Sequence, residues 1–108
     1  MEIEKSETQI QKEIKDYLEA CNFLVLRMNA GVVKKGRRYI HLAESGTPDL
    51  LAIGIVNIWF EVKRPGEKPS DDQIEMIHKL EKRGERVHVV CSVDDVRDII
   101  RASIRGLE

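Results

Sequence analysis

Apolar residues recur three or four positions apart in three segments of this chain, the spacing that places them on one face of a helix. Each segment begins at a serine that fits a helix N-cap, namely Ser6, Ser70 and Ser92. After the first two serines, a glutamine follows three residues later and completes a capping box. The pattern therefore predicts three helices, the first ending near Asn22 and the second at Gly84.

Shorter apolar runs between turn-forming residues predict the strands. These runs are residues 23–28, 37–42, 49–54, 57–63 and 87–91. The third and fourth runs are joined by a tight turn and form a β-hairpin, while Gly31 and Gly36 bracket a basic turn. Leaving aside the run at 37–42, we expect the order α-β-β-β-α-β-α. This is an α/β fold in which helices flank a mixed sheet, and the last strand returns parallel through a crossover.

The length of 108 residues suits one domain, so residues 1–108 are expected to fold as a single unit. With 42% hydrophobic and 34% charged residues, the chain is too apolar for a disordered segment and too charged for a membrane span. No secretion leader is recognisable, and Cys21 and Cys91 form no CxxC pair or Cys/His cluster, which excludes a zinc finger. We expect a cytoplasmic protein with two reduced, buried thiols and no membrane partner.

Strand 57–63 bears two charges on one face. Because side chains alternate along a strand, Glu61 and Lys63 point to the same side. If the hairpin turns near Ile55, Asp49 lies opposite Glu61 or Val62 on the partner strand. Charges among apolar residues are costly to desolvate and need partners. Two interpretations stay open. The first is a salt bridge of the hairpin, Lys63 with Asp49 or Glu61. The second is a Mg²⁺ site for phosphodiester hydrolysis, in which the carboxylates hold the metal and the lysine orients the attacking water.

The net charge of -1 at first argues against a nucleic-acid partner, but its distribution changes that inference. Residues 20–43 contain no acidic residue. The cations of this stretch are Arg27, Lys34, Lys35, Arg37 and Arg38, with Tyr39 and His41 nearby. They form either an arm that contacts phosphates or a solvated hairpin. Arg64 and Lys68 extend the basic character past Lys63.

Short motifs occur in combination along most of the chain. They are SETQIQ at residues 6–11, RMNAG at 27–31, GTPDLL at 46–51, FEVKRPG at 60–66 and SDDQ at 70–73. Together they resemble the virus-type replication-repair nuclease domain (VRR-NUC) of the PD-(D/E)XK nuclease superfamily, in its stand-alone phage or prophage form. The resemblance covers residues 6–95. It implies a restriction-endonuclease-like PD-(D/E)XK core.

The resemblance assigns site residues one by one. Its catalytic set is Asp49, Glu61, Lys63, Glu7 and Gln73. Within this set Asp49 and Glu61 become metal ligands, joined by the backbone carbonyl of Val62, and the implied cofactor is Mg²⁺ or Mn²⁺. The residues themselves leave other roles open for two members. Glu7 is also a favourable charge at a helix N-terminus, and Gln73 also completes a capping box.

The implied function is a metal-dependent DNA endonuclease that acts as a homodimer on branched DNA such as four-way (Holliday) junctions. It would work in the host cytoplasm if phage-encoded, with no small-molecule substrate. The expected DNA-binding residues are Arg27, Asn29, Lys34, Lys35, Arg37, Arg38 and Arg64. The expected interface is strand 87–91 or the last helix, with Ile99, Ile100, Ile104 and Leu107. The alternatives are a non-catalytic nucleic-acid-binding module and a small protein-interaction domain.

Overall fold

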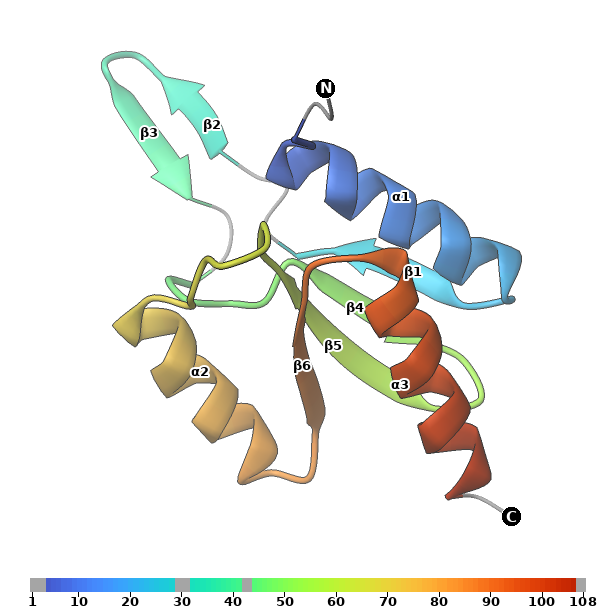
Figure 1. Cartoon of the computed structure of the whole chain (residues 1–108). Helices are drawn as coiled ribbons and strands as arrows, with labels where there is room; N and C mark the ends of the chain where they lie inside the picture. The colour runs from blue at the N-terminus through green and yellow to red at the C-terminus, as the bar shows by residue number, and fades with distance from the viewer. Residues whose placement is uncertain (1–3, 29–31, 42–43, 107–108) are drawn as a thin grey trace.

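The computed structural model describes residues 4–28, 32–41 and 44–106, which form three helices and six strands (Figure 1). In chain order the elements are α1 (Glu7–Ala20), β1 (Leu24–Arg27), β2 (Val32–Lys35), β3 (Arg38–His41), β4 (Leu50–Ile53), β5 (Asn57–Val62), α2 (Asp71–Glu81), β6 (Arg86–Val90) and α3 (Val93–Arg105). The predicted capping boxes form at the start of α1 and of α2, and Ser92 caps α3.

Four strands form one mixed sheet in the order β1-β4-β5-β6. The first three are antiparallel neighbours, and β6 pairs parallel to β5 after the α2 crossover. The parallel return is therefore confirmed, as is the tight turn between β4 and β5. With the separate β2–β3 pair set aside, the order is the predicted α-β-β-β-α-β-α.

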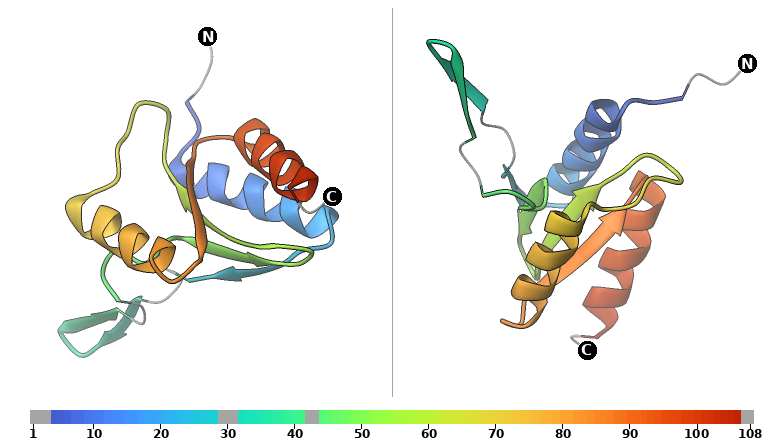
Figure 2. Two further views of the ribbon diagram at one scale, coloured as in Figure 1. Left: turned by 90° about the horizontal axis from the view of Figure 1, so that it is seen from below. Right: turned by 90° about the vertical axis from the view of Figure 1, so that its left-hand side faces the viewer.

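Helices α1 and α3 cover one face of this sheet, and α2 lies on the other side of it beside β6 (Figures 1 and 2). The core lies between the sheet and the first two of these helices. It consists of Ile10, Ile14, Leu18, Phe23, Val25, Leu50, Ala52, Val56, Ile58, Phe60, Val62, Val90, Val96 and Ile100. Each large apolar side chain buried there stabilises the fold by about 1.5–3 kcal/mol.

The second face of the sheet is covered less completely. Helix α2 has no buried residue, and on β1 the side chains of Leu24 and Leu26 are 60% and 40% exposed. Strand β6 is only partly buried, since Val87 and Val90 are buried but Val89 is 45% exposed. The one charged side chain of β5, Glu61, points to this second face, where it meets Gln73 at the N-terminal end of α2.

Strands β2 and β3 form a two-stranded hairpin that projects away from the main body (Figures 1 and 2). The sequence predicts a basic turn between Gly31 and Gly36. This prediction is wrong for residues 32–35, because they form strand β2. The turn itself lies at Gly36 and Arg37, where Gly36 adopts a φ of 66°. Two consecutive valines favour an extended strand before that turn.

Some side chains differ in their burial from what the sequence predicts. Cys21 is exposed rather than buried, because it is the C-cap of α1 where the chain leaves the helix, and Cys91 is half-buried; both are free thiols. Ile100 belongs to the core and is only 5% exposed, so it is not available to an interface. Leu107 lies outside the described residues. No described helix has both the length and the apolar stretch needed to cross a membrane.

Candidate active site

The pairing of β4 with β5 brings two carboxylates together. Leu50 pairs with Phe60, so Asp49, one residue before β4, lies across from Glu61 as the sequence predicted. The backbone N–H of Val62 donates a hydrogen bond of 2.8 Å to Asp49 Oδ2. Asp49 is 7% exposed and Glu61 is fully buried. The hairpin register thus fixes an acidic pair at one end of the sheet.

Glu61 is the most strongly perturbed group of this pair. Burial, and then the negative charge of Asp49, raise the pKa of Glu61 from 4.5 to about 8, although Lys63 opposes the shift. Its Oε1 atom accepts a hydrogen bond from Gln73 and lies 3.6 Å from Lys63 Nζ. Its Oε2 atom is buried and receives no hydrogen bond from a nitrogen or hydroxyl donor of the described residues. A side-chain hydrogen bond with Asp49 also raises the pKa of Glu61, so the two carboxyl groups share a proton when no cation is present.

Lys63 follows β5 directly and lies on the same face as Glu61. Its side chain is 14% exposed, and its backbone N–H donates a 2.9 Å hydrogen bond to the carbonyl of Val90 on β6. The ion pair that the sequence left as an alternative is thus present between Lys63 and Glu61. However, it involves Oε1, while Oε2 receives no hydrogen bond from a nitrogen or hydroxyl donor of the described residues. The salt bridge alone does not explain why the carboxylate is buried.

Gln73 caps α2 and also contacts the acidic pair. Its Oε1 atom accepts a 2.8 Å hydrogen bond from the backbone N–H of Ser70, which completes the capping box of α2. Its Nε2 atom donates a 2.9 Å hydrogen bond to Glu61 Oε1. One side chain therefore ties the start of α2 to the acidic pair.

Glu7 is the first residue of α1 and is half-buried. Burial raises the pKa of Glu7; the charge of Lys63 lowers it, and that of Asp49 raises it. These influences place its carboxylate within electrostatic reach of the site. The helix N-terminus role is equally present, since Glu7 lies in the first turn of α1.

A contact that the sequence analysis missed links the segment before Asp49 to α2. Gly46 has a φ of 86°, and a Cβ atom there would lie 2.3 Å from the backbone oxygen of Asp72. Next to it, Ser45 Oγ donates a 2.8 Å hydrogen bond to Asp72 Oδ2. The glycine of the GTPD motif is the one sequence feature that could have indicated this contact, because glycine permits both the positive φ and the close approach of the two backbones. The segment before Asp49 thus packs against the N-terminal end of α2, which also contains Gln73.

The donor atoms suit a hard divalent cation. Mg²⁺ is usually held by one or two carboxylates together with water and substrate phosphate. Asp49 and Glu61 supply two carboxylates, and a cation there would replace the proton that they share. No group of three His, Cys, Asp or Glu residues that could hold a metal occurs in the described part of the chain. Any resident ion would therefore rely on this pair and on backbone or solvent oxygens.

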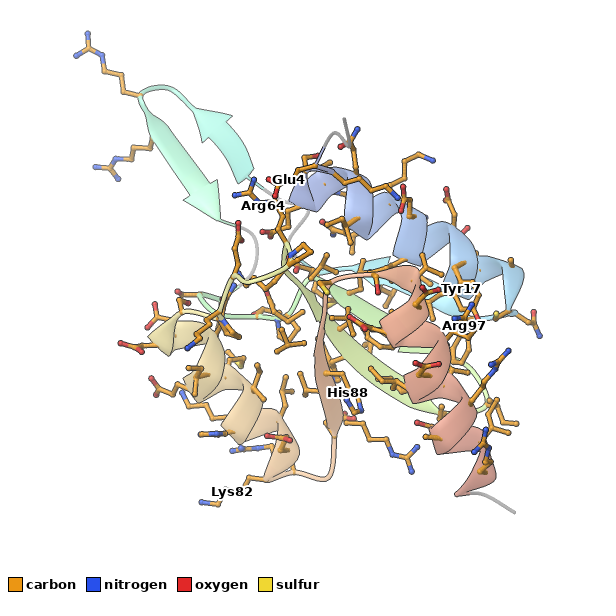
Figure 3. The ribbon with its side chains drawn as sticks, in the orientation of Figure 1. Glu4, Tyr17, Arg64, Lys82, His88 and Arg97 are labelled. Atoms are coloured by element: carbon orange, nitrogen blue, oxygen red, sulfur yellow. The ribbon has the colours of Figure 1, made fainter. Side chains whose placement is uncertain are left out.

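The expected DNA-binding residues do not form one cluster. Arg37 and Arg38 are exposed at the hairpin turn, and Lys34 and Lys35 lie in β2. Arg27 belongs to β1 of the main sheet, within the predicted strand 23–28, so it is separate from the hairpin that holds the other cations of the expected arm. Asn29 lies outside the described residues. Arg64 is exposed after β5, forms a 2.6 Å ion pair with Glu67 and lies beside Glu4 in Figure 3.

This chain is similar to proteins of known structure. No protein-family model matches this chain, and no curated protein does. Among solved structures, one described as "VRR_NUC domain" is 32% identical, with 88% of this chain and 94% of that chain covered and a TM-score of 0.66. Another, "VRR_NUC domain protein", is 18% identical, covers 96% and 92% of the two chains, and has a TM-score of 0.66. The second shows the shared fold alone.

Proposed function

Because this chain belongs to the VRR-NUC family, as 32% identity across nearly all of a VRR_NUC domain shows, we propose that it is a metal-dependent DNA endonuclease. Its active site is built on Asp49, Glu61 and Lys63. The observation that supports this most directly is the burial of two carboxyl groups side by side, Asp49 at 7% exposure and Glu61 fully buried, which raises the pKa of Glu61. Such an arrangement is unfavourable for a purely structural residue and favourable for a cation site.

The residues that would hold a Mg²⁺ or Mn²⁺ ion are Asp49 and Glu61, together with the backbone carbonyl of Val62. When bound, such an ion polarises the phosphoryl oxygen and activates water for attack. Lys63 orients the attacking water and offsets the negative charge that develops on the phosphate. Gln73 fixes the orientation of Glu61, as hydrogen-bonding partners of metal ligands generally do.

DNA is the proposed substrate because the exposed arginines of the hairpin, Arg37 and Arg38, lie in a region without acidic residues. Phosphate contacts of this kind position a duplex without reading its sequence. We propose further that the protein acts as a homodimer on branched DNA such as four-way junctions. A two-fold pair would present two sites to two strands.

The test is cleavage of supercoiled, linear and four-way-junction DNA with Mg²⁺ or Mn²⁺. Asp49→Asn and Lys63→Ala should each lose at least about 10²-fold in rate while DNA binding persists. Asp98→Asn and Lys82→Ala are matched controls, because these exposed residues lie on α3 and just after α2, and they should cleave like the parent. Cleavage without metal, or site variants as active as the controls, would overturn the proposal. Binding without cleavage by the parent would favour the non-catalytic module instead.

A further inference from the structure

A groove of about 300 Å³ lies between α1 and β1, and its lining is basic. The lining residues are Thr8, Gln11, Lys12, Lys15, Asp16 and Arg27. Those from α1 recur three or four positions apart, so they form one stripe along the helix. From Thr8 to Asp16 this stripe extends about 12 Å, at 1.5 Å per residue. We call this feature the α1 groove.

The charges of the α1 groove are available to a ligand. Three cations face one carboxylate, in a protein whose net charge is -1. Lys12 forms a 2.9 Å ion pair with Asp16 and Lys15 forms one with Glu19, and all four of these side chains remain partly exposed. Arg27 is exposed and has no described carboxylate within ion-pair distance. Because exposed ion pairs contribute little, such lysines can exchange their partner for a phosphate.

The α1 groove begins at the candidate active site. Thr8 directly follows Glu7, and Arg27 pairs with Leu50, the residue after Asp49. The backbone N–H of Met28 also donates a 2.8 Å hydrogen bond to the carbonyl of Asp49. From this end, α1 runs toward one side of the molecule, and the β2–β3 hairpin projects toward the other (Figures 1 and 2).

We propose that the α1 groove binds the sugar–phosphate backbone of DNA on the flank of the cut site opposite the hairpin. Lys12, Lys15 and Arg27 pair with phosphates, and Thr8 and Gln11 donate hydrogen bonds to the backbone. A length of about 12 Å accommodates about three phosphates of one strand, at 3.4 Å per nucleotide. This inference rests on the proposed function. It adds a second contact surface, formed by a helix that the sequence analysis did not assign to DNA binding.

The first experiment removes the cations of the groove. It measures anisotropy of a fluorescent duplex across salt concentrations, in a Lys63→Ala background so that no cleavage occurs. Lys12→Ala combined with Lys15→Ala should weaken binding about tenfold and reduce the slope of log affinity against log salt by about 2, since each phosphate contact adds about 0.9. The matched control is Lys79→Ala combined with Lys82→Ala, at the C-terminal end of α2, which should change affinity less than about twofold.

The second experiment tests a substitution that should increase the affinity for DNA. Asp16→Asn removes the carboxylate that competes for Lys12, so binding should tighten about threefold. Glu75→Gln is its control, because Glu75 forms the equivalent i,i+4 ion pair with Lys79 at 3.3 Å on α2. Thermal unfolding of every variant checks that the fold is retained.

The outcomes separate this inference from the function on which it rests. If the parent neither binds nor cleaves DNA, the proposed function fails and the groove inference fails with it. If the parent binds and cleaves, but the groove variants match their α2 controls in affinity and salt slope, the groove inference alone is wrong.

Discussion

The side-chain amide of Gln73 donates a 2.9 Å hydrogen bond to Glu61, while its oxygen caps the helix from which it projects. The same residue type forms a capping box on α1, where Gln9 accepts a 2.8 Å hydrogen bond from the backbone N–H of Ser6. Both side-chain and backbone hydrogen bonds of Gln9 in this capping box are with Ser6, and none of the hydrogen bonds of the described residues joins it to the acidic pair. The chain therefore contains one capping glutamine that touches the candidate site and one that does not.

This pair gives a matched prediction. Gln9→Ala and Gln73→Ala should each lower the free energy of unfolding by about 0.5–1.5 kcal/mol through the lost cap. Only Gln73→Ala should also weaken metal affinity or activity, by about 10–100-fold, because Glu61 loses its orienting donor. Chemical denaturation and metal-dependent cleavage measure the two effects. Equal activity of the two variants would mean that Gln73 only caps α2.

Much of this site follows from local sequence patterns. Alternation along strand 57–63 and the tight turn before it predicted that Asp49 faces Glu61, and the register of β4 with β5 confirms this. Both capping boxes are likewise readable, because their hydrogen bonds join residues three positions apart. Patterns with a period of two or of about four describe contacts within one element or between neighbours along the chain.

Contacts between distant segments were not predictable in this way. Ser45 and Asp72 are 27 positions apart, and no periodicity relates them. Arg27 was grouped with the hairpin cations because it is near them in sequence, whereas β1 pairing places it beside α1. Cys21 was expected to be buried because its neighbours are apolar, but the end of α1 turns it outward.

The buried carboxylate predicts how stability depends on pH without metal. In the native state the pKa of Glu61 is raised to about 8 from 4.5, so between these pH values the folded protein binds more protons than the unfolded chain. The free energy of unfolding should therefore fall as pH rises through this range. Thermal unfolding in EDTA measures this trend, and added Mg²⁺ should reduce it by competing with the proton.

Glu61→Gln tests the origin of that trend, because an amide does not ionise. This variant should keep its unfolding temperature more nearly constant across the same pH range, and it should be more stable than the parent near pH 8. A parent and variant that lose stability in parallel would assign the pH dependence to other groups.

The close approach of Gly46 to α2 predicts that Gly46→Ala, which adds one methyl group, lowers the stability of the protein strongly. Gly84 has a similar φ, 85° against 86°, but open space where its Cβ would lie. Gly84→Ala should therefore cost about 1–2 kcal/mol from the backbone conformation alone. Gly46→Ala should cost more, because its Cβ would lie 2.3 Å from the oxygen of Asp72, and it should also reduce cleavage by moving Gln73. Similar losses of stability in both variants would contradict the proposed contact.

Asp49 and Glu61 are proposed to bind a divalent cation between them. Calorimetric titration of Mn²⁺ into the protein tests this without any substrate. We predict Mn²⁺ binding by the parent, weakening of at least about tenfold in Asp49→Asn and in Glu61→Gln, and equal or tighter binding in Lys63→Ala, where a repelling charge is removed. Mn²⁺ binding of unchanged affinity and stoichiometry in both carboxylate variants would contradict the claim.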